Sequence, residues 1–142
     1  MYYIVYPLLY IVSLFPFFIL YVISDFIAFL LYHVIGYRKN VVINNLAIAF
    51  PEKSDEERIK IAKKFYQYFT DTFIESLKFI SISKEELLKR STGSFDLINN
   101  LINKGHNINL MAGHQFNWEF ANLLYSNNVK IPFVGIYMPV EN

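Results

Sequence analysis

The hydrophobic pattern divides the chain into two unequal parts near Tyr37. Residues 1–37 are almost continuously apolar, and Asp25 is the only Asp, Glu, Lys or Arg among them. A helix needs about 20 apolar residues to cross a bilayer, so this segment is long enough for a membrane anchor. From Arg38 onward, apolar and polar residues are mixed as in water-soluble proteins. The pattern therefore predicts a membrane segment followed by a water-facing part.

Three arrangements of the apolar segment are compatible with its sequence. The first is a span over about Tyr3–Ile23, with Phe26–Ile35 continuing as an interfacial helix. The second is a hairpin that enters one leaflet, since Pro7 and Pro16 would each kink a helix. The third is a pair of buried core helices. A cleaved signal peptide is disfavoured, because no basic residue precedes the run and the run is too long.

Helical signals dominate the next part of the chain. Residues 40–51 predict a connecting helix that ends at Phe50-Pro51. Ser54 followed by Glu57 is a capping box and predicts the start of a long helix. Apolar residues at steps of three and four would form its buried face: Ile59, Ala62, Tyr66, Phe69, Phe73, Leu77 and Ile80. The other side would carry Lys60, Lys63, Lys64, Gln67, Asp71, Glu75 and Lys78.

Shorter elements follow the long helix. A second capping box at Ser83–Glu86 predicts a helix through about Lys89, and Phe95–Asn103 predicts another that ends at Lys104-Gly105. The apolar runs Ile108–Ala112 and Ile131–Met138 predict strands. Between these strands we expect a turn over residues 113–117 and a helix from Trp118 to about Tyr125. Strand, turn, helix and strand in this order predict a parallel sheet.

These elements predict an α/β fold class with three regions. Residues 1–37 would form the membrane anchor, residues 38–90 a helical connector, and residues 91–142 the first half of a parallel-stranded α/β catalytic domain. Arg38 and Lys39 close the apolar segment, and cations favour the cytoplasmic side, so the remainder is expected there. Two or three strands leave an open sheet edge, so we expect the chain to be truncated within this domain.

Composition excludes several functional classes. The chain is 54% hydrophobic, its net charge is +1, and it contains no cysteine. No dense Lys/Arg face suited to nucleic acid is evident. The lack of cysteine excludes disulfides, thiolate catalysis and Cys-ligated zinc.

The residues best suited to chemistry lie in the turn before the last predicted helix. His114 would stand at the end of the first strand, and Glu119 in the first turn of the helix. An imidazole, with an unperturbed pKa of about 6.5, can take the proton of an attacking hydroxyl. A carboxylate on its other ring nitrogen fixes the tautomer and stabilises the imidazolium. Acyl transfer directly to an acceptor alcohol would explain this pair, because no Ser or Cys of this stretch is placed as a nucleophile.

Two neighbouring residues are candidates for binding substrate. The backbone donors at Gly113, or at the helix start capped by Asn117, could hold the oxyanion that forms during acyl transfer. Both positions belong to the same turn as His114.

The sequence GHxxNWE at residues 113–119 resembles the H-x4-D/E block of the lipid A biosynthesis acyltransferases, also called late or lauroyl/myristoyl acyltransferases. Upstream, Arg38, Asn45-Leu46 and Phe50-Pro51 follow the R…NL…FP order of that family. The resemblance covers nearly the whole chain. Met138 stands where the family often has an arginine, which speaks against an acyl-donor or phosphate contact there.

The resemblance implies an O-acyltransferase of the inner membrane, with its catalytic part on the cytoplasmic side. It would transfer a fatty acyl group from acyl carrier protein to a hydroxyl of a lipid A precursor, with no metal and no organic cofactor. His114 would be the general base and Glu119 the residue that orients it. The implied partners are acyl carrier protein, the lipid A precursor and membrane lipids, with no nucleic acid.

Three other functions stay open at this point. The acceptor could be another lipid or glycolipid, or the chain could be a truncated, non-catalytic homologue anchored in the membrane. A metallohydrolase with His114 and Glu119 as ligands is disfavoured, because a zinc site takes about three or four ligands and only two candidates cluster here.

Overall fold

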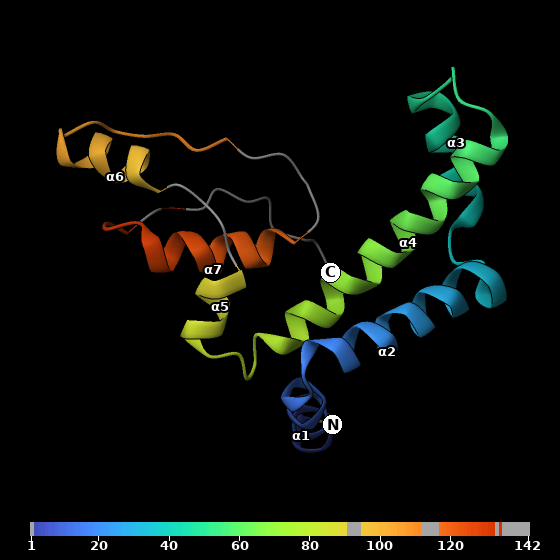
Figure 1. Cartoon of the computed structure of the whole chain (residues 1–142), viewed down its shortest axis with the longest axis horizontal. Helices are drawn as coiled ribbons and strands as arrows, with labels where there is room; N and C mark the ends of the chain where they lie inside the picture. The colour runs from blue at the N-terminus through green and yellow to red at the C-terminus, as the bar shows by residue number, and fades with distance from the viewer. Residues whose placement is uncertain (1, 91–94, 112–116, 133, 135–142) are drawn as a thin grey trace. The chain divides into compact units, whose positions relative to one another are not determined.

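The computed structural model describes residues 2–90, 95–111, 117–132 and 134. The chain forms two compact units, one over Met1–Ile82 and one over Ser83–Asn142. The first unit contains helices α1 and α2, a π-helix (η1), and helices α3 and α4. The second contains helices α5, α6 and α7 (Figure 1).

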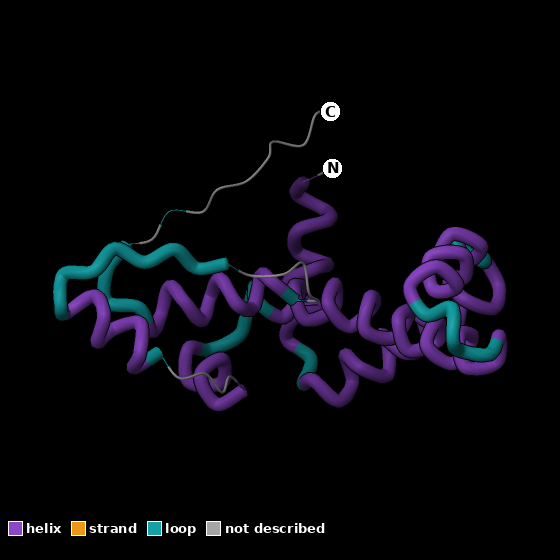
Figure 2. Tube along the Cα trace, turned by 90° about the horizontal axis from the view of Figure 1, so that it is seen from above, coloured by secondary structure: helices purple, strands orange, loops and turns teal. Residues whose placement is uncertain are grey.

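The expected parallel-stranded α/β domain over residues 91–142 is wrong, because no strand occurs among the described residues (Figure 2). Residues 108–111 and 131–132, which belong to the two predicted strands, have no regular secondary structure. Leu110 is 49% exposed and Met111 98% exposed. A strand needs a neighbour to pair its backbone N–H and C=O groups, and the described residues supply none. Apolar runs predict burial, and a buried strand needs a sheet and a layer of helices to pack against. The described residues of this region form no such sheet.

The N-terminal apolar segment is interrupted at Pro16. Helix α1 (Tyr2–Leu14) ends before this residue, and helix α2 (Phe17–Phe29) begins after it. Pro16 is extended, with φ −65° and ψ 154°, and it has no N–H to continue the helix. The two helices leave the break in different directions (Figure 2). A single helical span over Tyr3–Ile23 is therefore wrong, whereas Pro7 lies inside α1 without ending it.

The segment that is long and apolar enough to cross a membrane is Phe17–Ile35, judged by length and composition. It comprises α2 and the π-helix η1 (Leu30–Ile35). Only 22% of its most apolar stretch is buried, whereas the core helix of a soluble protein would be mostly buried. The exposed side chains include Phe18, Val22 and Phe26. Exposed apolar surface of this kind favours contact with lipid.

Helix α4 (Asp55–Lys78) runs antiparallel to α2 and η1 in the first unit (Figure 1). The core between them consists of Ala28, Tyr32, Ala62 and Tyr66. The two alanines are small enough for close approach of the helices. The two tyrosine rings pack edge to face, with centroids 5.4 Å apart. Helix α3 (Lys39–Ala49), predicted as the connecting helix, packs against this core through Val42, Ile43 and Leu46.

The predicted capping box at the start of α4 is confirmed. The backbone N–H of Ser54 donates to Glu57 Oε2 at 2.8 Å, and the Glu57 N–H donates to Ser54 Oγ at 3.3 Å. Hydrogen bonds from the backbone and then the side chain of Ser54 hold the pKa of Glu57 below its usual value. The carboxylate therefore stays ionised at neutral pH, and the first turn of α4 keeps both of its bonds.

The buried face of α4 differs in part from the predicted one. Its buried residues recur every fourth position: Ala62, Tyr66, Thr70, Ile74 and Lys78. Phe73, placed on the core face by its spacing, is 61% exposed. Thr70 is tolerated inside because its hydroxyl donates to the carbonyl of Tyr66 at 2.9 Å.

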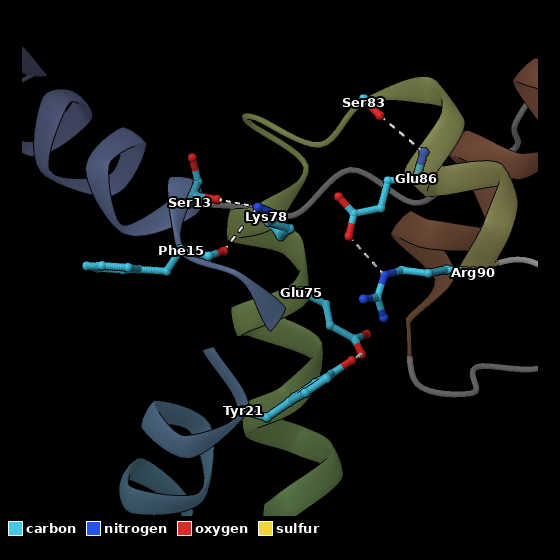
Figure 3. A network of polar contacts seen from close by, with 8 residues as sticks. All are labelled: Ser13, Phe15, Tyr21, Glu75, Lys78, Ser83, Glu86 and Arg90. Carbon is cyan, nitrogen blue, oxygen red and sulfur yellow. Dashed lines mark hydrogen bonds and ion pairs between the residues drawn. The ribbon is translucent and has the colours of Figure 1, made fainter. Parts of the chain in front are cut away.

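Lys78 differs most from the prediction for α4. We expected it on the polar side of the helix, and its exposed fraction is only 7%. Its Nζ donates to the carbonyl oxygens of Ser13 at 2.9 Å and Phe15 at 3.0 Å (Figure 3). Ser81 Oγ also donates to Ser13 O at 2.7 Å. The last carbonyls of a helix have no partner within it. Lys78 supplies those donors at the end of α1, and this fixes α1 against α4.

The three predicted helices of the second unit are confirmed as α5 (Lys84–Arg90), α6 (Asp96–Asn103) and α7 (Trp118–Asn128). At the start of α5, the Glu86 N–H donates to Ser83 Oγ at 3.1 Å (Figure 3). Gly105, with φ 80°, ends α6 in the left-handed region that glycine adopts freely. The Asn99 side chain donates to Asn128 O at 3.0 Å, which joins α6 to the end of α7.

Candidate active site

Asn117 starts helix α7 and is the best-defined residue of the GHxxNWE block. Its side chain accepts a hydrogen bond from the Phe120 N–H at 3.2 Å, so the predicted N-cap is confirmed. Its backbone has φ 67° and ψ 44°, the left-handed region, whereas most N-cap residues are extended. Asparagine tolerates this conformation better than other residues with a Cβ. Asn117 therefore both turns the chain into α7 and caps it.

Glu119 lies in the first turn of α7 and is exposed. The helix N-terminus carries partial positive charge, which favours a carboxylate at this position. Trp118, the neighbouring residue, is 51% exposed. An exposed carboxylate and a half-exposed indole thus lie next to each other at the start of α7.

Gly113 and His114 lie outside the described residues. The contact between His114 and Glu119 therefore stays a prediction, as does the binding role of Gly113. In the described ranges, no three His, Asp or Glu side chains are grouped closely enough to hold a metal ion.

The two other histidines have different surroundings. His33 lies in η1, with its ring centroid 4.9 Å from that of Phe29 and 4.7 Å from that of Tyr32. His106 is exposed, and its backbone N–H donates to Leu101 O at 3.1 Å. His106 belongs to the second unit and is a matched control for His114.

Substitutions of Asn117 separate its two local roles. Asn117→Ala removes the cap and places a Cβ without a capping group in the left-handed region, so we expect a loss of about 2 kcal/mol in unfolding free energy. Asn117→Gly fits that region and costs only a few tenths of a kcal/mol at an N-cap. Urea unfolding followed by circular dichroism should give a higher free energy of unfolding for Asn117→Gly than for Asn117→Ala. Equal stability of the two variants would remove the strain argument.

A second concave site lies in the first unit, between α3 and α4. It encloses about 250 Å³ and is lined by Tyr37, Arg38, Val41, Val42, Asn45, Phe65, Tyr66 and Phe69. The sequence analysis placed Tyr66 and Phe69 on the buried face of the long helix and did not predict this pocket. Arg38 and Asn45, which belong to the R…NL…FP order, were the residues that could have pointed to this pocket.

Comparison with protein families defines the class of this protein as an acyltransferase. The family model described as bacterial lipid A biosynthesis acyltransferase matches residues 1–141. The chain belongs to this family, as the GHxxNWE resemblance implied. Neither a curated protein nor a solved structure matches the chain at the significance required. The family and the apolar helix Phe17–Ile35 together indicate association with a membrane.

Proposed function

We propose that this protein transfers a fatty acyl group from acyl carrier protein to a hydroxyl of a lipid A precursor at the cytoplasmic face of the inner membrane. His114 acts as the general base, and Glu119 orients it. The observation that carries the proposal is the family match over residues 1–141, which includes the whole GHxxNWE block.

The reaction needs a group that accepts the proton of the attacking hydroxyl. It also needs donors that stabilise the oxyanion of the tetrahedral intermediate. His114 takes the proton of the acceptor hydroxyl as its oxygen attacks the thioester carbonyl carbon of the donor. The tetrahedral intermediate then collapses, the C–S bond breaks, and the imidazolium returns the proton to the departing sulfur. Glu119 accepts from the second ring nitrogen and stabilises the imidazolium. Glu119 is thus a positioning residue, because it acts through His114.

The local structure of α7 supports these roles. The exposed carboxylate of Glu119 is accessible to a ring on the preceding turn. The first backbone N–H groups of a helix have no partner within the helix and carry partial positive charge. At α7, the side chain of Asn117 accepts from the N–H of Phe120 and caps the helix start, where the partial positive charge of the helix would favour an oxyanion.

The apolar helix supports the proposed membrane placement. Phe17–Ile35 ends just before Arg38 and Lys39, and cations next to a span favour the cytoplasmic side.

Transfer of a labelled acyl group by the full chain in detergent tests the proposal. The donors compared are acyl carrier protein thioester and the same acyl group on coenzyme A, and the acceptors are a lipid A precursor and a lysophospholipid. We expect labelled product from the carrier-protein donor and the lipid A precursor. Product on the lysophospholipid alone would assign another acceptor, and no product with any pair would indicate a non-catalytic homologue.

A further inference from the structure

The pocket between α3 and α4 has an apolar wall and a cationic rim. Val41, Phe65 and Phe69 belong to the wall, and Arg38 lies at the rim with its side chain exposed. The pocket encloses about 250 Å³, which is below the usual range of about 300–1,000 Å³ for sites that hold a whole small ligand. A ligand of this pocket would therefore insert only part of itself.

Two lysines add positive charge at the same end of the first unit. The Nζ atoms of Lys39 and Lys63 lie 4.1 Å and 5.8 Å from the centroid of the Tyr32 ring, although one lysine belongs to α3 and the other to α4. The ion pairs in the described part of the chain join Arg58 to Asp55 and Arg90 to Glu86. The charges of Arg38, Lys39 and Lys63 are therefore not neutralised by an ion pair with a described carboxylate.

The backbone at Arg38 adds an independent observation. Arg38 has φ 50° and ψ 24°, a left-handed conformation that costs a residue with a Cβ about 1–2 kcal/mol. It is also the N-cap residue of α3, and it makes no side-chain cap hydrogen bond. Strained residues of this kind are concentrated at functional sites.

A hydrogen bond joins two residues that line the pocket. The Tyr66 hydroxyl donates to the carbonyl oxygen of Tyr37, which holds the turn before Arg38 against α4. Burial, and then the neighbouring Tyr32 and Tyr37, raise the pKa of Tyr66. Its hydroxyl therefore remains a donor at neutral and moderately basic pH, and the rim keeps its position.

The apolar helix indicates what the pocket meets. Phe18, Val22 and Phe26 are exposed on this segment, which ends three residues before Arg38, so contact of its apolar face with the bilayer would bring Arg38 and Lys39 near the lipid headgroups. Basic groups at this level attract anionic lipids. The pocket and its cations would then face a phosphate group and the first part of an acyl chain.

We propose that this pocket binds one anionic phospholipid of the bilayer. Its phosphate would lie at Arg38, with Lys39 and Lys63 adding positive charge at the same end of the unit, and the upper part of one acyl chain would lie against Val41, Phe65 and Phe69. The rest of the lipid would remain in the membrane, in agreement with the small volume of the pocket. This lipid is neither donor nor acceptor in the proposed reaction, so the inference does not depend on that function.

Native mass spectrometry of the full chain, released from detergent micelles, tests the proposal with phosphatidylglycerol, phosphatidylcholine and inorganic phosphate as probes. We expect one bound phosphatidylglycerol with at least about tenfold preference over phosphatidylcholine. The triple variant R38Q/K39Q/K63Q should lose about tenfold or more in phosphatidylglycerol affinity. The control K60Q/K64Q/K84Q removes the same charge at exposed lysines that neither line the pocket nor lie over the Tyr32 ring, and it should keep the affinity for phosphatidylglycerol.

A second variant tests the apolar wall without changing charge. Val41→Trp fills the pocket and should reduce lipid occupancy even if the triple variant fails to fold. Equal losses in the triple variant and its control would overturn the proposal in favour of non-specific attraction. Equal binding of the two lipids would overturn it in favour of ordinary bilayer contact, and complete competition by inorganic phosphate would assign a free phosphate site instead.

Discussion

Replacing His114 with alanine should slow acyl transfer by about 10²–10⁴-fold, the usual contribution of a general base. The loss should fall on kcat with little change in KM, because the imidazole acts on a proton that moves only in the reaction. Steady-state transfer from acyl carrier protein to a lipid A precursor, measured on the full chain, provides both constants.

His106→Ala is the matched control for this variant. His106 is an exposed histidine of the second unit, and its side chain has no part in the proposed reaction. Its substitution should leave kcat unchanged. Near-normal turnover of His114→Ala would remove the assignment of the base, whereas equal losses in both variants would indicate damage to the second unit.

Replacing Lys78 with methionine should destabilise the first unit by about 2–3 kcal/mol, since hydrogen bonds to charged groups are worth about 1.5–3 kcal/mol. Methionine has a similar length but no donor for the carbonyls of Ser13 and Phe15. Ser81 continues to donate to Ser13, so Phe15 loses its donor. Urea unfolding in detergent, followed by circular dichroism, measures the change.

Lys64→Met is the control for this substitution. Lys64 lies on the same helix, is exposed, and loses the same charge. Its effect should remain within about 0.5 kcal/mol, as is usual at surface positions. A Lys78 variant as stable as the Lys64 variant would mean that the two hydrogen bonds do not hold α1 in place.

Local signals predicted the helices of the second unit and the start of α4. Ser54 and Glu57 are three residues apart, and Gly105 follows its helix directly, so each signal lies within one turn of what it determines. The two strand predictions were wrong because strand formation is not determined by neighbouring residues alone. Burial and pairing of residues 108–111 depend on distant parts of a sheet, and the apolar run itself does not encode them.

The position of Lys78 was unpredictable from spacing alone. Its partners Ser13 and Phe15 precede it by 65 and 63 residues, and they become acceptors only because Pro16 ends the preceding helix. Lysine is rarely buried, so a pattern of polar and apolar residues places it outside. Buried lysines of this kind require knowledge of the tertiary contact.

The candidate site was predictable as a motif and only partly as a geometry. The GHxxNWE block identified the family, and the capping role of Asn117 followed from residue type. The left-handed backbone of Asn117 did not follow, because several residue types could begin a helix with an extended N-cap.

The cooperation of His114 and Glu119 is tested most directly by a double-mutant cycle on kcat. We expect Glu119→Ala to reduce kcat less than His114→Ala does, and the double variant to be as slow as His114→Ala alone, within about threefold, because Glu119 acts through the imidazole. Losses that multiply in the double variant would contradict this account, since they would show that the carboxylate and the imidazole work independently.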